Sequence, residues 1–427
     1  MHEITPLATV DLDLKVPGSK SITQRALIAA ALAQGDSTLI GPLASEDTAY
    51  TATALQSMGI EVIRRKESWT IKGTGGSIAT PAQQICLGNT GTATRFLASV
   101  VALGQGSFII AGEKRMEERP IAPLIQALTG WGVDIRSINN TGCPPLAINA
   151  RGIQGGETTL PAGKSSQYLS SLLLVAPYAR HQAILHVEGQ VPSKPYVTMT
   201  LAVMRAFGAD LTASDQLNYF AIRPKAYEAT TYQVEGDASS ASYFFAAAAI
   251  TGGRVRVENV PHPSLQGDTA LVEILARMGC TVDYGDGITV VGPRELRGVE
   301  VDMGDCPDVA PTLAIVAAHA KGRTIIKNIA HLRIKECDRI TAVATELAKM
   351  GARVEERPDA LIIEGAANGA PLHGAEIDTY NDHRIAMCFG VAGLVTPGVK
   401  IKNRECVVKS FPDFWERFQW LYEGPCL

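Results

Sequence analysis

An almost wholly apolar helical run follows directly on a polar cluster six times along the 427-residue chain. The clusters begin at residues 18, 88, 163, 236, 304 and 381, so their starts are 70, 75, 73, 68 and 77 residues apart. Runs such as Ala26–Leu32 and Tyr243–Ala249 predict helices that are apolar on every side, and such helices are normally buried. Repetition at this period predicts one supersecondary unit used six times.

A strand and a second, amphipathic helix complete each repeat. In the fifth repeat Ile340, Val343, Leu347 and Met350 form one apolar stripe among polar neighbours. In five of the six repeats this helix ends in an apolar residue followed by a glycine that suits a left-handed helix cap, at Met58-Gly59, Trp131-Gly132, Phe207-Gly208, Met278-Gly279 and Met350-Gly351. A buried first helix and a half-exposed second one predict an α/β fold with helices inside and sheets outside.

The length and the repeat number together predict two domains of three repeats each. We place the crossover near Val234–Gly236 and assign the short N-terminal strand to the second half, which gives a first domain of residues 1–19 plus 236–427 and a second of 20–235. Helix N-termini present free N–H groups and a positive dipole end, so they favour anions. We expect the buried helices of the two domains to converge on an interdomain cleft that holds the site.

Composition narrows the classes of function. Hydrophobic residues make up 46% of the chain, charged residues 19%, and the net charge is −4, which argues against a general nucleic-acid or membrane surface. The N-terminal segment lacks the features of a secretory signal, no run is long enough to span a bilayer, and we expect a cytoplasmic monomer. The eight cysteines and eight histidines show no metal-ligand spacing, so no metal is expected.

Motifs in the clusters and between them carry a resemblance that covers the whole chain. The chain resembles the 3-phosphoshikimate 1-carboxyvinyltransferases, or 5-enolpyruvylshikimate-3-phosphate (EPSP) synthases. The matching segments, in order, are Pro17–Ser21, Gly88–Ala93, Glu118–Ile121, Ser165–Gln167, Ser193–Tyr196, Glu235–Tyr243, Lys335–Arg339, Asp382–Arg384 and Lys409–Pro412. Any one segment alone would be weak support, whereas the ordered set is specific.

The resemblance implies both a fold and a reaction. The fold is a two-domain inside-out α/β barrel, with three βαβαββ units in each domain. The reaction transfers the enolpyruvyl group of phosphoenolpyruvate to the 5-hydroxyl of shikimate 3-phosphate. It releases phosphate, needs no cofactor, and belongs to chorismate and aromatic amino-acid biosynthesis.

Both implied substrates are anions, and the family's motifs supply the cations and hydrogen-bonding groups to bind them. The resemblance implies that phosphoenolpyruvate is bound by Lys20, Gly91, Arg119, Gln167, Arg339, Arg384 and Lys409. It implies that shikimate 3-phosphate is bound by Lys20, Ser21, Arg25, Ser165, Ser166, Gln167, Ser193, Tyr196, Asp308, His331 and Lys335. Arg119 and Arg339 also fit a simpler interpretation as surface ion-pair partners, and Ser165 or Ser166 as a helix N-cap.

The chemistry requires proton transfer in two directions. The methylene carbon of phosphoenolpyruvate is protonated while the ring hydroxyl loses its proton and attacks, giving a tetrahedral adduct that expels phosphate. The resemblance implies that Asp308 is the base at the hydroxyl and Glu336 the acid/base at the methylene carbon, with Lys20 as an alternative proton donor. For Asp237 we favour a structural role, as an N-cap or a hinge contact.

Two positions depart from the family pattern. Phe96 stands where proline is frequent, which bears on sensitivity to the inhibitor glyphosate more than on the reaction. His331 stands where some members have asparagine, and we expect it to contact the shikimate phosphate.

Three alternative functions remain open at this point. A sister transferase acting on UDP-N-acetylglucosamine carries a reactive cysteine at the position of Lys114, and the loop Ala111–Pro120 has no cysteine. An RNA 3′-phosphate cyclase would need a nucleotidyl-accepting histidine and a basic face. A non-catalytic anion-binding protein would gain nothing from Asp308 and Glu336 beside its cations. The Gly163–Ser165 segment is not a nucleotide-binding P-loop, because that motif needs glycine where the chain has Thr158.

Overall fold

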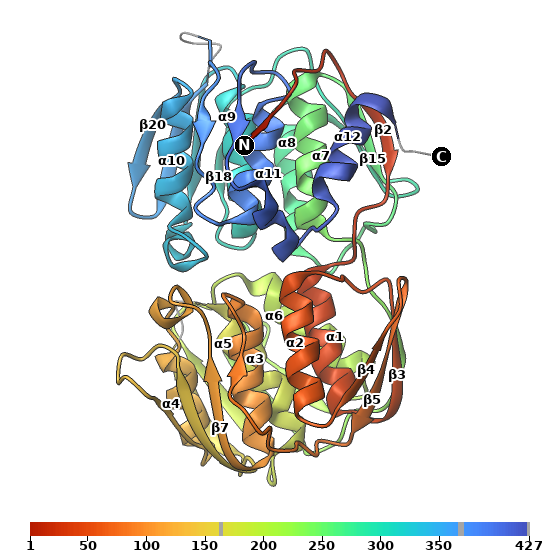
Figure 1. Cartoon of the computed structure of the whole chain (residues 1–427), viewed down its shortest axis with the longest axis vertical. Coiled ribbons are helices and arrows are strands. Elements are labelled where there is room, and N and C mark those ends of the chain that lie inside the picture. The colour runs from red at the N-terminus through yellow and green to blue at the C-terminus, as the bar shows by residue number, and fades with distance from the viewer. Residues whose placement is uncertain (162–164, 366–370, 425–427) are drawn as a thin grey trace. The chain divides into compact units, whose positions relative to one another are not determined.

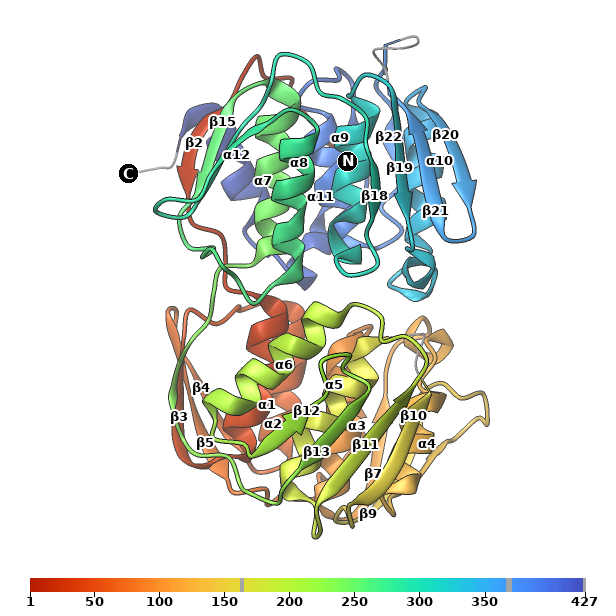
Figure 2. The same cartoon turned by 180° about the vertical axis from the view of Figure 1, so that it is seen from behind.

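The computed structural model describes residues 1–161, 165–365 and 371–424. The chain divides into two compact units. The continuous unit is Gly18–Val234, and the discontinuous unit combines Met1–Pro17 with Glu235–Leu427. Within each unit, small sheets lie on the outside and helices pack between them (Figures 1 and 2). The predicted position of the active site between two domains stays a prediction.

The first helix of each repeat is buried along nearly its whole length, as the apolar runs predict. These helices are α1 (Lys20–Leu32), α3 (Gly91–Val100) and α5 (Ser166–Val175) in the continuous unit, and α7 (Ala238–Thr251), α9 (Ala310–Ala318) and α11 (His383–Ala392) in the discontinuous unit. In α1 every residue from Ile22 to Leu32 is buried. Such a helix cannot face water without exposing apolar surface, so it forms the core.

The second helix of each repeat is only partly buried, also as predicted. These helices are α2 (Glu46–Ser57), α4 (Ala122–Gly130), α6 (Lys194–Ala206), α8 (Ala270–Arg277), α10 (Arg339–Lys349) and α12 (Phe414–Glu423). The five predicted glycine caps are confirmed. Gly59, Gly132, Gly208, Gly279 and Gly351 each follow a helix and have φ between +82° and +113°, a conformation that a side chain disfavours.

Three four-stranded sheets enclose the helices of the continuous unit. The first sheet has, in spatial order, β14 (Thr231–Gln233), β3 (Gln34–Ile40), β5 (Ser68–Thr74) and β4 (Glu61–Arg64). The second has β6 (Ile85–Cys86), β7 (Gln105–Ala111), β9 (Leu146–Arg151) and β8 (Asp134–Ser137). The third has β10 (Gly156–Pro161), β11 (Ala183–Glu188), β13 (Tyr219–Ile222) and β12 (Leu211–Ala213).

The discontinuous unit has two four-stranded sheets and one of three strands among its described residues. One four-stranded sheet has β16 (Thr281–Asp283), β17 (Ile288–Val291), β15 (Arg254–Val257) and β2 (Asp11–Leu14). The other has β18 (Glu300–Asp302), β19 (Arg323–Lys327), β21 (Ala360–Glu364) and β20 (Arg353–Arg357). The three-stranded sheet has β1 (His2–Glu3), β23 (Lys400–Ile401) and β22 (Glu376–Ile377). Within the described ranges no strand pairs outside its own sheet, so the sheets surround the helices without closing into a hydrogen-bonded barrel.

The sheets share one plan, and two strands are exchanged between the units. In four repeats the strand before the buried helix pairs in parallel with the strand after it. The strands that precede α1 and α7 instead belong to the other unit than the helix that follows them. β2 pairs with β15 in the discontinuous unit, and β14 pairs with β3 in the continuous unit. In the sixth repeat the N-terminal strand β1 supplies the antiparallel partner of β23.

Asn259 holds the ends of both crossover segments inside the discontinuous unit. Its side-chain Nδ2 donates to the carbonyl of Val16 at 2.7 Å, and its Oδ1 accepts from the Val16 N–H at 3.0 Å. Its own carbonyl accepts from the N–H of Gly236 at 2.8 Å. A Cβ on Gly236 would lie 2.7 Å from the Asn259 side chain, so glycine is required for this approach.

We therefore expect Asn259→Ala to destabilise the discontinuous unit. The change leaves the N–H and C=O of buried Val16 without their partner, and each such loss costs roughly 1–3 kcal/mol. The midpoint of urea unfolding should fall, and limited proteolysis near residues 15–18 should become faster. Asn149→Ala is the control, because the exposed Asn149 amide bonds only exposed neighbours. Equal midpoints for the two variants would contradict the role given to Asn259.

Candidate active site

The polar residues singled out in the sequence gather at the N-terminal ends of the helices. In the continuous unit Lys20 and Ser21 open α1, Gly91 opens α3, and Ser165 precedes α5. In the discontinuous unit Asp308 lies in the turn η5 (Pro307–Val309) before α9, and Arg339 and Arg384 lie in the first turns of α10 and α11. The sides of the buried helices are mostly apolar, so most of the polar groups lie at their ends.

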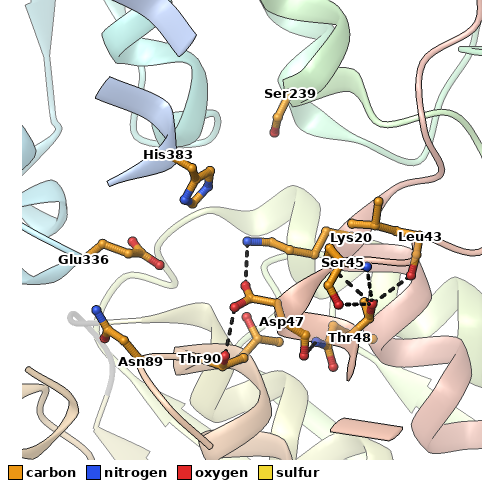
Figure 3. Close-up of polar contacts among 12 residues, drawn as sticks. Lys20, Leu43, Ser45, Asp47, Thr48, Asn89, Thr90, Ser239, Glu336 and His383 are labelled. Atoms are coloured by element: carbon orange, nitrogen blue, oxygen red, sulfur yellow. Dashed lines mark hydrogen bonds and ion pairs between the residues drawn. The ribbon is translucent and has the colours of Figure 1, made fainter. Parts of the chain in front are cut away.

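Lys20 is held by a buried carboxylate that the sequence did not point to. Its Nζ lies 3.0 Å from Oδ2 of Asp47, near the start of α2, and Asp47 is only 3% exposed (Figure 3). The other carboxylate oxygen accepts from the Thr90 hydroxyl at 2.8 Å. Thr90 is the N-cap of α3, so one carboxylate links the starts of three helices. It also fixes the position of the ammonium group.

Two guanidinium groups approach the N-terminus of α3 at Gly91. A Cβ at Gly91 would lie 2.5 Å from Nη2 of Arg119 and 2.6 Å from Nη1 of Arg95. Arg119 is 3% exposed and donates to the carbonyl and side-chain oxygen of Asn89 at 3.1 and 3.2 Å. Cations are normally disfavoured at the positive end of a helix, so two of them here favour an anion as ligand. The interpretation of Arg119 as a surface ion-pair partner is wrong, because it is buried.

Gln167 is linked to the same helix end. Arg95 donates to its Oε1 at 2.8 Å, and its Nε2 donates to the Thr92 hydroxyl at 3.1 Å. Arg95 also stacks over Tyr168, with 5.3 Å from the guanidinium carbon to the ring centroid. The starts of α3 and α5 therefore form one polar cluster with Gly91, Arg119 and Gln167.

Arg25 has a large structural role. It is 1% exposed and donates to the Thr200 hydroxyl at 2.7 Å, the Ser170 hydroxyl at 3.1 Å, and the carbonyls of Ser21 and Tyr196 at 2.9 and 3.2 Å. Its guanidinium lies 5.3 Å from the ring of Phe96. Burial lowers the pKa of Arg25 to about 10, so it stays a cation at neutral pH. Phe96 is thus a packing partner of Arg25, and its effect on inhibitor sensitivity stays a prediction.

The serine positions lie at the starts of two helices, where Ser165 caps its helix and Ser166 and Ser193 are buried. Ser165 is the N-cap of α5, and its hydroxyl accepts from the Gln167 N–H at 3.2 Å, as the simpler interpretation predicts. Ser166 is the first residue of the helix and is 7% exposed. Ser193 precedes α6 in a left-handed conformation, with φ +52°. Gly163 and Lys164 lie outside the described residues.

Arg339 is the centre of an ion network in the discontinuous unit. It is 2% exposed, and its Nε donates to Oδ2 of Asp382 at 2.7 Å. Its Nη1 donates to Asp308 at 3.2 Å, and its Nη2 donates to Glu336 at 2.8 Å. Burial lowers its pKa, but Asp382, Glu336 and Asp308 more than offset this and raise it above the ordinary value. Arg339 is therefore a permanent buried cation and not a surface ion-pair partner.

Asp308 lies among three cations. Oδ2 accepts from Nη2 of Arg384 at 2.6 Å, and Oδ1 lies 3.7 Å from Nζ of Lys335 as well as 3.2 Å from Arg339. Arg384 is 5% exposed and follows Asp382, whose carboxylate caps α11 by accepting from the Arg384 N–H at 2.9 Å. The structure thus brings together Asp308, Lys335, Glu336, Arg339 and Arg384.

His331 and Lys409 complete the predicted set in this unit. His331 lies in η6 (Ala330–Ile334), and burial together with the nearby Lys335 lowers its pKa to about 4, although Asp308 opposes the shift. It is therefore neutral at pH 7. Lys409 ends η8 (Arg404–Lys409) and is 6% exposed. Asp237 caps α7 by accepting from the Ser240 N–H at 2.7 Å, which agrees with the favoured structural role.

Sequence reasoning missed the partners of the cations. Nothing in the sequence pattern singles out Asp47 or Asp382 as such partners, or Arg95 as a further buried cation, although Asp382 lies in the segment Asp382–Arg384. Acidic residues are common in the first turn of a helix because they interact favourably with the helix dipole. The position of Asp47 in the sequence therefore does not indicate a functional role.

The described residues contain no cluster of histidine, cysteine, aspartate or glutamate side chains able to hold a metal ion. In the described part of the chain, no helix has both the length and the apolar character needed to cross a membrane.

Comparison with known proteins identifies the family. The EPSP synthase (3-phosphoshikimate 1-carboxyvinyltransferase) profile matches residues 4–418. A 3-phosphoshikimate 1-carboxyvinyltransferase of Trichormus variabilis is 44% identical over 412 residues, covering 96% of both chains. One from Shewanella baltica is 43% identical over 420 residues, covering 97% of this chain and 98% of the relative. The solved EPSP synthase of Acinetobacter baumannii superposes with a TM-score of 0.80 at 31% identity and covers 97% of this chain and 96% of its own.

The chain is thus a carboxyvinyl transferase by fold and by sequence. It belongs to the EPSP synthase family, whose members act in the shikimate pathway of aromatic amino-acid biosynthesis. The predicted family and fold class are confirmed.

The Lys20–Asp47 contact gives a direct test. Asp47→Asn keeps an oxygen for Thr90 but turns the second position into an amide that cannot pair with the ammonium. We expect kcat/KM to fall about tenfold or more, because a charge-assisted contact is worth roughly 1.5–3 kcal/mol. Steady-state kinetics would measure this. Glu61→Gln, which removes the exposed Lys72–Glu61 pair, is the control and should leave kinetics unchanged. Unaltered kinetics in Asp47→Asn would show that Lys20 needs no such support.

Proposed function

We propose that the residues assembled in the two units carry out the reaction for which the family is named, through a tetrahedral intermediate. The enolpyruvyl group of phosphoenolpyruvate is transferred to the 5-hydroxyl of shikimate 3-phosphate, and phosphate leaves. The observation that carries the proposal is the pairing of carboxylates with buried cations, above all Asp308 and Glu336 around Arg339. Unlike the Asp382 side chain, which is wholly buried against Arg339, the side chains of Asp308 and Glu336 remain 18% and 9% exposed and so can meet a substrate.

Phosphoenolpyruvate is assigned to the cations and to the polar end of α3. Arg119 and Gly91 in the continuous unit, and Arg339 and Arg384 in the discontinuous unit, are the strongest candidates. A guanidinium matches carboxylate and phosphate oxygens with two parallel hydrogen bonds. Lys20, Gln167 and Lys409 complete the proposed set.

Shikimate 3-phosphate is assigned to side-chain hydroxyl groups and to cations whose positions are fixed by their neighbours. The proposed contacts in the continuous unit are Lys20, Ser21, Arg25, Ser165, Ser166, Gln167, Ser193 and Tyr196. Those in the discontinuous unit are Asp308, His331 and Lys335. Arg25 acts here mainly by fixing the backbone of Ser21 and Tyr196, to whose carbonyls it donates.

Asp308 and Glu336 are the proposed acid/base pair. Asp308 takes the proton of the 5-hydroxyl of shikimate 3-phosphate. The hydroxyl oxygen then forms a bond to the second carbon of phosphoenolpyruvate. Glu336 delivers a proton to the methylene carbon and takes one back when phosphate leaves, with Lys20 as the alternative donor. Positive charge from Arg339 and Arg384 stabilises the anionic adduct, since preorganised charge needs no rearrangement in the transition state.

We infer that the enzyme works in the cytoplasm as a monomer, with its two small-molecule substrates as its only ligands, and without nucleic acid, membrane, metal or cofactor. The sister transferase activity is disfavoured because Lys114 occupies the position of that enzyme's reactive cysteine.

Phosphate release from phosphoenolpyruvate tests the function. We expect release with shikimate 3-phosphate and none with UDP-N-acetylglucosamine. Lys20→Ala and Glu336→Gln should each lower kcat by at least about 10²-fold, the usual contribution of a positioned acid or base. Lys72→Ala, at an exposed lysine, is the matched control. Phosphate release with the nucleotide sugar alone would identify the sister activity. No release with either acceptor would favour a non-catalytic binding protein.

His331 provides a test with a defined pH dependence. Because its pKa is lowered to about 4, the imidazole is uncharged throughout pH 5.5–8. His331→Ala should raise the KM for shikimate 3-phosphate by roughly 3–10-fold, the value of a neutral hydrogen bond. His331→Asn should recover most of it. The ratio of the His331→Asn KM to that of the wild type should stay constant across this range. A ratio that grows below pH 6.5 would mean that the charged imidazole binds the phosphate.

A further inference from the structure

Asp268 is a buried carboxylate behind the ion network to which the family resemblance gave no role. It lies in the turn η4 (Gly267–Thr269) before α8 and is 4% exposed. Its Oδ2 accepts a hydrogen bond from the hydroxyl of Ser239, in the first turn of α7. That hydroxyl also lies 3.3 Å from Nη2 of Arg384, and the same nitrogen donates to Asp308 at 2.6 Å.

The direction of these hydrogen bonds is fixed by chemistry. A hydroxyl has one proton, and Ser239 gives it to Asp268. A guanidinium can only donate, so Ser239 meets Arg384 through an oxygen lone pair. Asp268 thus makes Ser239 an acceptor and thereby helps to set where the Arg384 guanidinium stands.

The segment that carries Asp268 is itself fastened to the start of α7. Oε1 of Gln266 accepts from the Ala238 N–H at 2.9 Å, and its Nε2 donates to the Gly236 carbonyl at 2.7 Å. Nε2 also donates to Glu235 at 3.0 Å. This attachment holds Asp268 against Ser239 independently of any contact at Arg384.

We propose that Asp268 is a positioning residue of the reaction, which acts through Ser239 to hold Arg384 in the orientation that binds phosphoenolpyruvate. The inference rests on the proposed function, in which Arg384 contacts that substrate and Asp308 is the base. Burial raises the pKa of Asp268 to about 6, and the Asp308 charge adds to the effect, so the two carboxylates influence each other across Arg384. At pH 7.5 Asp268 is ionised.

The test uses two variants of the whole enzyme assayed at pH 7.5. Asp268→Asn keeps the size and an acceptor oxygen but removes the charge, and Ser239→Ala removes the connecting hydroxyl. Each should raise the KM for phosphoenolpyruvate about tenfold and leave that for shikimate 3-phosphate within about twofold. The double variant should be no worse than the more impaired single variant, because both act along one path.

Glu346→Gln is the matched control. Glu346 is a wholly buried carboxylate on α10 that accepts from Lys349 at 2.9 Å and from the Tyr380 hydroxyl at 2.7 Å. Its replacement should lower thermal stability without a selective change in the KM for phosphoenolpyruvate.

Each outcome bears on the proposal. Unchanged kinetics in Asp268→Asn, an equal rise in both KM values, or effects of the two variants that multiply would overturn it. If Asp268→Asn does not fold, Ser239→Ala alone must show the selective rise. A wild-type enzyme that releases no phosphate with shikimate 3-phosphate would instead refute the proposed function, so the two failures are distinguishable.

Discussion

The apolar surface of the repeated first helix is the constraint on which the rest of the structure depends. A helix such as α1, buried from Ile22 to Leu32, must be covered on every side, so each unit places its sheets outside and its helices inside. The sides of these helices are then mostly apolar, with few polar groups such as Arg25 and Ser170. Functional groups are confined to the helix ends, where N–H groups and the positive end of the dipole already favour anions. The fold thus directs anion binding to the same place in every repeat.

Placing cations at those ends creates a second requirement. Lys20, with 15% of its side chain exposed, and Arg339, at 2%, carry charge that burial opposes. The protein offsets this with carboxylates of its own, Asp47 for Lys20 and Asp382 for Arg339. The carboxylates also orient the cations, which matters for a reaction whose transition state is stabilised by charges already in position. The same arrangement explains why acidic residues accumulate where anionic substrates are proposed to bind.

The sequence allowed prediction of features that repeat or are local. The buried helices, the glycine caps such as Gly59 and Gly351, and the role of Asp237 all follow from patterns within a few residues. The pairings that complete the site did not follow, because they join distant segments. Lys20 and Asp47 are 27 residues apart, and Arg339 and Asp382 are 43 apart. Of the two exchanged strands, only the N-terminal one was assigned to the second half from the sequence, and no prediction was made for β14. A strand of four residues, such as β2, or of three, such as β14, carries little pattern of its own. Arg25 was assigned to substrate, yet its four internal acceptors are visible only in the folded chain.

The distribution of chemistry between the units follows from the same repeat. The proposed acid and base, Asp308 and Glu336, both lie in the discontinuous unit, whereas Lys20 and Arg119 lie in the continuous unit. Each unit therefore holds cations for an anion, but only one holds the proposed proton-transfer carboxylates. A single backbone plan has been kept while the residues at the helix ends have diverged, from Lys20 at α1 and Gly91 at α3 to Arg384 at α11. Divergence at those few positions changes the chemistry without disturbing the apolar sides that hold the fold together, and so the helix ends are where one repeat can serve several roles in one reaction.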